Sequence, residues 1–355
     1  MSAIAFAIPG DIDLPTGGYA YDRRLLAEWR GTGVAARHIA LPGSFPFPTD
    51  ADLALTGQAI LSQTSWDDTL LIDGLAYGAF PEGIAAGLAG RVVALVHHPL
   101  GLETGLAPEQ SRHLLARETA ALRHARAVVT PSPAMKRILA ADFGVDEARI
   151  TIAPPGVDPA PRAKGGAAEG PLQLLAVGSV VPRKGYHVLV EALATLRDRD
   201  WHLTIVGAND RAPQTLRDLT EQIDAAGLKD RILLAGAVDD TTLAAAYDGA
   251  DLFVMPSLFE GYGMVLTEAL ARGLPIVCTT GGAAADTAPD AAAMKVSPGD
   301  ALALAKAIAS LIDAPARRDA LADAAWTAAA SLPRWRETAA IVAGVCLPDA
   351  GRKVG

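Results

Sequence analysis

Two glutamates, Glu260 and Glu268, have a spacing that suits ligand binding. They are eight positions apart, slightly more than two helical turns. If a helix begins near Gly263, Glu260 lies in the loop before it and Glu268 lies within it. The amides of residues 261–265 are then free at the helix N-terminus and attract an anion. Carboxylates would bind hydroxyls and amides a phosphate or sugar oxygen, as a nucleotide sugar requires. The alternative is a solvated Glu260 beside an ordinary helical Glu268.

Two adjacent cations lie in an earlier loop of the same half. Arg183 and Lys184 follow an apolar segment and are enclosed by Gly178, Pro182 and Gly185. The guanidinium offers a planar fork of donors and the ammonium a mobile point charge, which together suit a diphosphate. The alternative is a solvated basic pair.

The N-terminal half offers two further candidates. Gly17 and Gly18 follow the first apolar segment, and paired glycines allow a ligand to approach the backbone closely. His97 and His98 directly follow another apolar segment, where a strand would deliver a side chain to a ligand. The alternatives are a plain turn and a core histidine.

Weaker candidates complete the set. Val238, Gly282 and Asp286 are additional candidates for lining the site. Two Asp-x-Asp sequences, at residues 11–13 and 198–200, have a form that can hold a divalent metal. A metal site of this kind would directly follow a strand, and only the first of the two sequences could do so. We therefore expect no metal ligands.

An alternation of strands and helices must position these residues. Short apolar runs bounded by turn signals are typical of strands buried on both faces of a parallel sheet. They occur at residues 4–8, 69–72, 92–96, 127–130, 172–177, 203–206, 232–234, 252–255 and 276–279. Helices are predicted between them, for example at residues 19–30 and 108–126. Because ligands of doubly wound sheets bind at the carboxyl ends of strands, the loops named above are the expected sites.

A Pro/Gly/Ala-rich stretch at residues 158–171 divides the chain. It has no apolar period and is typical of an interdomain linker. We expect one α/β domain at residues 1–164, a second at 165–330, and a C-terminal segment at 331–355.

Composition limits the class of protein. The chain has 355 residues and a formal net charge of −9, without the basic excess of a duplex-DNA binder. We expect no nucleic-acid partner. The two cysteines, Cys278 and Cys346, have no metal-ligand spacing and fit a reducing interior. No targeting or membrane-spanning segment is visible, which favours the cytoplasm.

Five motifs in order resemble glycosyltransferase family 4, the retaining enzymes of the GT-B fold. The most specific is EGYGMVLTEALARGLPIV, which carries Glu260 and Glu268. VGSVVPRKGYHVLVEAL is similar to the donor-phosphate loop of that family, and RITIAPPGVD to the segment that closes its N-terminal domain. The glycine pair and the histidine after a strand complete the resemblance.

The resemblance implies an architecture. Two Rossmann-like, doubly wound α/β domains would face each other across a cleft. The N-terminal domain would bind the acceptor and the C-terminal domain the nucleotide-sugar donor. The last helix would cross back to the N-terminal domain.

The resemblance also assigns roles in the C-terminal half. Arg183 and Lys184 would bind the donor diphosphate, Glu260 the sugar hydroxyls and Glu268 the ribose. The loop that follows Glu260 would contact sugar and phosphate through Gly261, Tyr262, Gly263, Met264 and Val265.

Roles in the N-terminal half follow in the same way. Gly17 and Gly18 would approach the phosphate or the acceptor. His97 matches the catalytic-site histidine of the family, whereas His98 stands where the family usually has aspartate. Ala285 stands where a proline usually precedes the acidic residue, here Asp286.

The implied reaction is a metal-independent, retaining hexosyl transfer. The leaving phosphate would accept the acceptor's proton, while cations stabilise its growing charge. We expect no cofactor, and UDP-sugar is favoured over GDP-sugar. The acceptor is open: a small molecule, a saccharide or a lipid. The oligomeric state is open as well.

The segment at residues 108–126 bears on membrane contact. It carries Arg112, Arg117, Arg123 and Arg126, tempered by Glu109 and Glu118. We expect at most peripheral contact.

Two alternatives keep the same fold. One is a nucleotide-sugar epimerase, against which the Glu260–Glu268 pattern speaks. The other is a nucleotide-sugar-binding regulator without turnover. A dinucleotide-binding dehydrogenase is disfavoured, because no predicted strand is followed by G-x-G-x-x-G.

Overall fold

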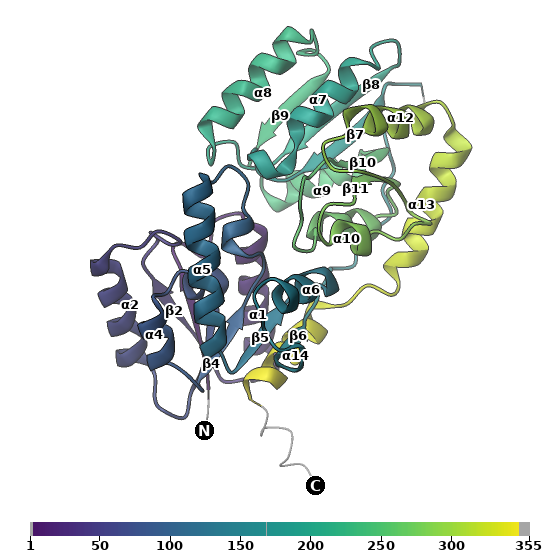
Figure 1. Cartoon of the computed structure of the whole chain (residues 1–355). Coiled ribbons are helices and arrows are strands. Elements are labelled where there is room, and N and C mark those ends of the chain that lie inside the picture. Colours follow the sequence, from purple (N-terminus) through teal and green to yellow (C-terminus); the bar gives the residue numbers. More distant parts are fainter. Residues whose placement is uncertain (1–2, 168, 348–355) are drawn as a thin grey trace. The chain divides into compact units, whose positions relative to one another are not determined.

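The computed structural model describes residues 3–167 and 169–347. The chain divides into two compact units. Unit 1 comprises Met1–Gly156 and Pro333–Gly355, and unit 2 comprises Val157–Leu332. Each is a six-stranded parallel sheet with helices on both faces (Figure 1). The expected α/β fold of two doubly wound sheets is therefore confirmed.

The sheet of unit 1 has the strand order β2-β1-β3-β4-β5-β6. Its strands are β1 Ile4–Pro9, β2 Ala36–Leu41, β3 Thr69–Asp73, β4 Val92–Leu95, β5 Ala127–Thr130 and β6 Ile150–Ile152. Its helices are α1 Gly17–Thr32, α2 Asp50–Gln63, α3 Gly74–Tyr77, α4 Glu82–Gly87, α5 Pro108–His124, α6 Pro133–Ala141 and α14 Trp335–Cys346, with the 3-10 turns η1 Leu100–Leu102 and η2 Glu147–Arg149.

Alternate side chains of the central strand β1 enter two cores. Ala5 and Ala7 belong to an apolar cluster that includes Tyr77. Phe6 points to the other face, where its ring meets that of Trp29 on α1 at 6.1 Å between centroids. A strand with both faces covered has no solvated side, so β1 is apolar throughout.

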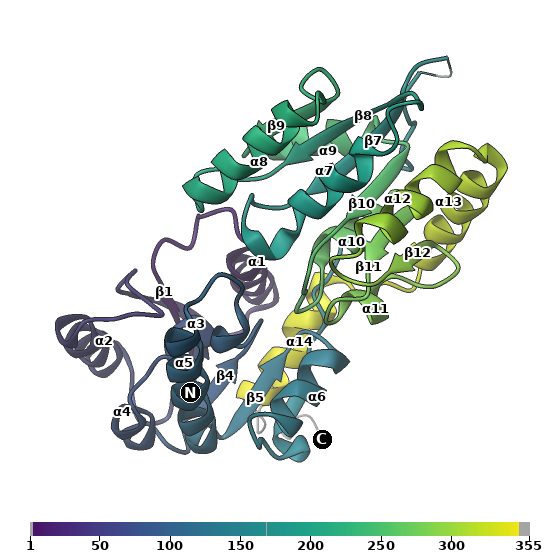
Figure 2. The ribbon, with the colours of Figure 1, turned by 45° about the horizontal axis from the view of Figure 1, so that its top comes forward.

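The C-terminal helix α14 completes the face of unit 1 that α1 covers (Figure 2). The indole Nε1 of Trp29 donates to the Ala339 carbonyl at 2.9 Å. Thr69 Oγ1 donates to the Cys346 carbonyl at 2.7 Å. The expected return of the last helix to the N-terminal unit is therefore what the structure shows. Residues 348–355 of that predicted segment lie outside the described residues.

The sheet of unit 2 has the order β12-β11-β10-β7-β8-β9. Its strands are β7 Leu172–Val177, β8 Trp201–Val206, β9 Ile232–Gly236, β10 Leu252–Met255, β11 Ile276–Thr279 and β12 Ala293–Val296. Its helices are α7 Tyr186–Ala194, α8 Pro213–Ala225, α9 Asp240–Asp248, α10 Met264–Leu270, α11 Ala284–Thr287, α12 Ala301–Ile312 and α13 Pro315–Ala329, with the 3-10 turn η3 Pro182–Lys184.

Unit 2 has a core on each face of its sheet. On β10, Leu252 and Val254 join the core beneath α7, α8 and α12. Phe253 and Met255 join the core with residues of α9 and α10. This alternation is the physical reason why the predicted strands of the second half are continuous apolar runs.

The predicted domain boundary at residue 164 is wrong by several residues. The chain enters unit 2 at Val157. Residues of the expected linker form backbone hydrogen bonds with that unit. The Ala163 amide donates to the Arg272 carbonyl at 2.9 Å, and the Lys164 amide donates to the Asp248 carbonyl at 2.9 Å. Backbone hydrogen bonds leave no composition signal, so the sequence did not reveal them. The second boundary falls at residue 332.

Two of the four arginines in residues 108–126, one on α5 and one just after it, bind backbone carbonyls of unit 1. Arg117 donates to the Ala79 carbonyl at 2.9 Å, and Arg126 donates to the Val345 carbonyl at 3.1 Å. Glu118, expected to temper a charged face, is fully buried. No helix of the described residues is long and apolar enough to cross a membrane.

Candidate functional site

Two loops of unit 2 carry most of the predicted site residues. Arg183 and Lys184 lie on η3, which follows β7, and Glu260 follows β10. Strands β7 and β10 are parallel neighbours in the sheet, so their carboxyl ends meet at one edge. The Leu258 amide donates to the Arg183 carbonyl at 2.8 Å and joins the two loops.

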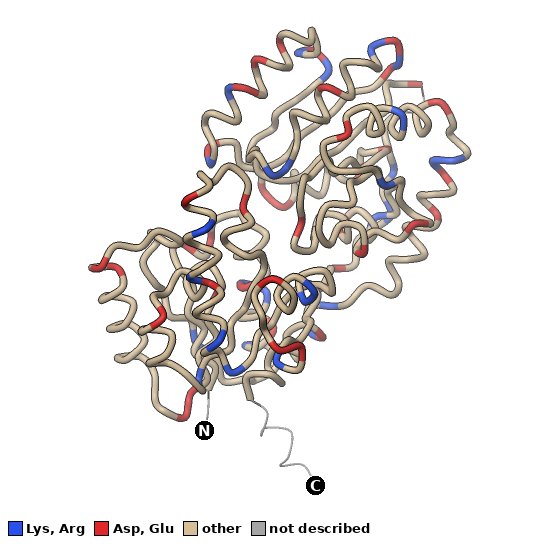
Figure 3. The backbone as a smooth tube through the Cα atoms, viewed as in Figure 1, with Lys and Arg blue, Asp and Glu red and all other residues tan. Residues whose placement is uncertain are grey.

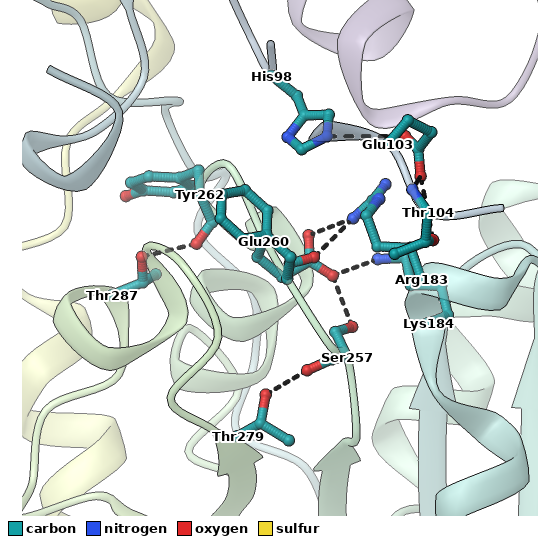
Figure 4. A network of polar contacts seen from close by, with 11 residues as sticks. His98, Glu103, Thr104, Arg183, Lys184, Ser257, Glu260, Tyr262, Thr279 and Thr287 are labelled. Carbon is teal, nitrogen blue, oxygen red and sulfur yellow. Dashed lines mark hydrogen bonds and ion pairs between the residues drawn. The ribbon is translucent and has the colours of Figure 1, made fainter. Parts of the chain in front are cut away.

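The three side chains form an ionic cluster around the buried carboxylate of Glu260 (Figure 4). Lys184 Nζ lies 2.7 Å from Glu260 Oε1, and Arg183 NH1 lies 3.3 Å from Glu260 Oε2. Ser257 Oγ donates to Glu260 Oε1 at 2.6 Å. Burial by itself raises the pKa of Glu260, but the two neighbouring cations and these hydrogen bonds lower it to about 2. Glu260 is therefore ionised, and the three groups together carry one positive charge.

Glycines allow these loops to touch. Gly185 has a φ of +65°, and a Cβ there would lie 2.3 Å from the Pro256 carbonyl oxygen. Gly282 has a φ of +64°, and its Cβ would lie 2.3 Å from the carbonyl oxygen of Glu260. Gly282, a predicted site candidate, therefore supports the backbone of Glu260, with which it forms a β-bridge.

The loop after Glu260 turns into α10 at Gly263. This residue has a φ of +89° and precedes the first helical residue, Met264. The amides of Met264 and Val265 stand in the first turn and have no acceptor within the helix. The carbonyl of Tyr262 accepts a hydrogen bond from Thr287 Oγ1 at 2.7 Å, and burial raises the pKa of Tyr262 to about 12. Gly261 is buried in this turn.

Glu268 is held by an aromatic partner that the sequence did not reveal. Tyr247 on α9 donates to Glu268 Oε2 at 2.8 Å, and the Arg272 guanidinium lies 4.4 Å from the centre of the Tyr247 ring. Burial raises the pKa of Glu268, although these partners lower it in part. A tyrosine in a predicted helix does not by itself indicate a partner for a distant glutamate. Only the packing of α9 on α10 identifies this contact.

Two weaker candidates of unit 2 lie outside the ionic cluster. Val238 packs on the apolar core of the α9 face. Asp286 is exposed on α11. The carboxylate of Glu260 contacts Arg183, Lys184 and Ser257 instead.

In unit 1, His97 follows β4 and is enclosed by two acids. Its Nε2 atom lies 3.1 Å from Asp22 Oδ1 and 3.6 Å from Asp73 Oδ2. Asp22 belongs to α1, and Asp73 ends β3, the neighbour of β4. The sequence reasoning missed both acids. Asp73 could have been found, because it directly follows a predicted strand.

The glycine pair begins α1 beside this histidine. A Cβ on Gly18 would lie 3.3 Å from Cδ2 of His97, whereas one on Gly17 would meet nothing within 4 Å. The ring of Tyr21 packs edge-on against His97 at 5.0 Å between centroids. Gly18 therefore supports the histidine, a role that the sequence did not assign to it.

The remaining candidates of unit 1 have local partners. His98 Nε2 lies 3.9 Å from Glu103 Oε2. In the first Asp-x-Asp sequence, Asp11 Oδ1 accepts from the amide of Asp13 at 2.9 Å, which is an Asx turn. The predicted residues thus fall into two groups, one at the carboxyl edge of each sheet.

Two doubly wound parallel sheets, the second with a Glu–Arg–Lys ionic cluster at its carboxyl edge, define a two-domain α/β protein of the GT-B class. The family model described as "Glycosyltransferase Family 4" matches residues 20–161, and that described as "Glycosyl transferases group 1" matches residues 158–327. The chain belongs to glycosyltransferase family 4.

Curated relatives agree with this assignment. D-inositol 3-phosphate glycosyltransferase of Arthrobacter sp. (strain FB24) is 35% identical over 68% of this chain and 59% of the relative. MMP alpha-(1->4)-mannosyltransferase of Mycolicibacterium hassiacum is 28% identical over 83% of this chain and 74% of the relative. The chain spans about three fifths of the length of the first of these.

Solved structures share the fold. Sucrose-phosphate synthase from Thermosynechococcus elongatus has a TM-score of 0.82 at 21% identity, over 98% of this chain and 100% of that chain. Anabaena HepE in complex with UDP and glucose has a TM-score of 0.76 at 19% identity, over 97% of this chain and 98% of that chain. These likenesses support the GT-B architecture.

Proposed function

We propose that this protein is a retaining hexosyltransferase. It moves a sugar from a nucleotide-diphosphate sugar to a small-molecule, saccharide or lipid acceptor, and it needs no metal. The observation that carries this proposal is the ionic cluster of Arg183, Lys184 and the buried Glu260 at the carboxyl edge of the second sheet. Its net positive charge suits a diphosphate, and its carboxylate suits sugar hydroxyls.

The chemistry follows from the charges of this cluster. As the glycosidic bond of the donor breaks, negative charge grows on the diphosphate. Arg183 and Lys184 stabilise that charge from fixed positions, as do the first-turn amides of α10. The leaving phosphate takes the proton of the acceptor hydroxyl on the same face of the sugar, so the configuration at the anomeric carbon is kept. Two fixed cations do the work that a divalent metal does in other transferases.

The activities of similar proteins guide the choice of substrates. HepE was solved with UDP and glucose, which supports a UDP-sugar as donor. Three of the named proteins act on or make phosphorylated molecules: D-inositol 3-phosphate glycosyltransferase, mannosylfructose-phosphate synthase and sucrose-phosphate synthase. An acceptor screen therefore starts with phosphorylated polyols and sugars.

Binding of nucleoside diphosphates tests the donor site. We expect UDP, GDP or ADP to raise the unfolding temperature, because a ligand of the folded state stabilises it. Arg183→Ala and Lys184→Ala should each weaken that binding at least tenfold. Lys164→Ala is the matched control, because Lys164 pairs with Asp248 at the surface of the same unit. Unchanged binding in both site variants would exclude the assignment to the diphosphate.

Product analysis tests the reaction. Transfer should continue in excess EDTA, and NMR of the product should show the anomeric configuration of the donor sugar. A loss of activity that added metal reverses would contradict metal independence. Conversion of the donor alone would indicate an epimerase, and binding without nucleotide release across the acceptor panel would indicate a regulator.

A further inference from the structure

Two carboxylates lie close to the same ring atom of His97, Nε2. Asp22 Oδ1 lies 3.1 Å from Nε2 and Asp73 Oδ2 lies 3.6 Å from it. The carboxylate of Asp22 is fully buried, and that of Asp73 is 4% exposed. The three groups offer atoms that all lie within 4.8 Å of one another. Such a convergence fixes the ring from one side.

Two carboxylates this close and this deeply buried do not both ionise near neutral pH. Burial raises the pKa of each carboxyl above its ordinary value. A hydrogen bond from Asp73 and the charge of Arg23 oppose this rise at Asp22, whereas the charge of Asp22 adds to it at Asp73. The pair therefore keeps a proton near neutral pH, and the hydrogen bonds around it decide which carboxyl carries it.

The hydrogen bonds place that proton. Asp73 Oδ1 already accepts from the Leu75 amide at 2.7 Å. Asp22 Oδ1 faces His97 Nε2, but its other oxygen, Oδ2, is buried and has no donor among the described residues. A side-chain hydrogen bond joins the two acids, and a proton on Asp73 would supply the donor that Asp22 Oδ2 lacks.

The pair also sets the tautomer of the histidine. With an ionised Asp22 as acceptor, His97 must carry its proton on Nε2. Burial lowers the pKa of His97, so the ring is neutral near pH 7. The other nitrogen, Nδ1, then keeps its lone pair and has no partner among the described residues. The side chain remains 22% exposed.

We propose that Asp22 and Asp73 are positioning residues that share one proton and hold His97 in its Nε2–H tautomer, with Nδ1 ready to accept a hydrogen bond from a substrate hydroxyl. The identity of that hydroxyl, on the donor sugar or on the acceptor, rests on the proposed function. The shared proton and the tautomer do not depend on it.

Two isosteric variants form a matched pair, because each removes one carboxylate from the same cluster. In Asp73→Asn the side-chain N–H replaces the proton of Asp73 and still donates to Asp22. In Asp22→Asn the protonated Asp73 donates to the amide oxygen, which turns the amide N–H towards His97 Nε2, so the ring must move its proton to Nδ1. We expect Asp22→Asn to lower kcat/KM at least 100-fold, as wrong tautomers do elsewhere by about 10⁴, and Asp73→Asn to stay within tenfold of wild type. Nucleoside diphosphate affinity should be unchanged in both.

A measurement without substrate reads the tautomer itself. The ¹⁵N shifts of the His97 ring should report the Nε2–H form in the wild type and in Asp73→Asn, and the Nδ1–H form in Asp22→Asn. If the wild type shows this pattern but transfers no sugar, the proposed function fails and the positioning pair stands. An Nδ1–H ring in the wild type, equal losses of activity in the two variants, or a stoichiometric divalent metal in the purified protein that either variant removes would overturn the proposal.

Discussion

At the scale of single residues, the neighbours of His97 determine what its side chain can do. His97 alone is equally compatible with a core role and a ligand role. Its contacts with Asp22 and Asp73 give it one orientation, and the lack of a side chain at Gly18 leaves room for the ring. The cluster around Glu260 follows the same rule, because two cations keep a buried carboxylate ionised. Function at this scale lies in charge pairs that the fold brings together.

Gly18→Ala should disturb His97 where Gly17→Ala does not. The new Cβ at residue 18 would lie 3.3 Å from Cδ2 of His97, so the ring must shift by a few tenths of an ångström. We expect a tenfold or greater fall in kcat/KM and a changed ring signal of His97 in NMR. Gly17→Ala meets no atom within 4 Å and should gain about 0.5–1 kcal/mol of stability, as an alanine does in a helix. Equal behaviour of the two variants would contradict this role of Gly18.

At the scale of elements, the buried carboxyl of Glu118 on α5 holds the loop that follows His97 and His98. Its Oε2 accepts from the Leu100 amide at 2.8 Å, and its Oε1 has no partner among the described residues. Burial raises the pKa of Glu118 to about 8, although this hydrogen bond opposes the rise. The folded protein therefore binds this proton more tightly than the unfolded chain does.

The stability of the fold should fall with rising pH because of Glu118. The contribution is fully present below the unfolded pKa of about 4.5 and is lost as the pH rises through about 8. Glu118→Gln imitates the protonated form, so it should match the wild type near pH 5 and exceed it by more than about 1 kcal/mol at pH 8. Urea unfolding across this range measures the difference. Glu109→Gln, at the exposed start of α5, is the control: its stability should differ from that of the wild type by the same amount at every pH. Parallel stability curves for the wild type and Glu118→Gln would count against a raised pKa of Glu118.

At the scale of the whole molecule, the chain leaves and re-enters unit 1 at adjoining points. A Cβ on Gly156 would lie 2.1 Å from the backbone nitrogen of Trp335, and Thr338 Oγ1 donates to the Pro154 carbonyl at 2.7 Å. The two crossings are thus tied to each other within unit 1.

The charges of the molecule show no pattern at this scale, because basic and acidic positions are interspersed along both units (Figure 3). The net charge of −9 therefore says nothing about the sign of a ligand, which the local cluster decides.

Gly156→Ala tests this junction. The contact is with backbone, which cannot move as a side chain can, so we expect a loss of about 1–3 kcal/mol of stability. Thermal unfolding of unit 1, followed by the near-UV signal of Trp29 and Trp335, measures it. Gly344→Ala is the control, since it lies on α14 and its Cβ would meet nothing within 4 Å. A Gly156→Ala protein as stable as this control would show that the crossings are not packed together.

The sequence by itself determined the class of fold and the main site loops. Apolar runs such as residues 252–255 predict strands because both faces of a parallel sheet are buried, and their order places Arg183, Lys184 and Glu260 at strand ends. It missed β2, β6 and β12, whose runs are short or broken by polar residues. Only the tertiary structure brought Tyr247 to Glu268 and Asp22 and Asp73 to His97. The physical reason is that periodicity reports which face of an element is buried, whereas the partner that a buried polar group meets depends on how distant elements pack.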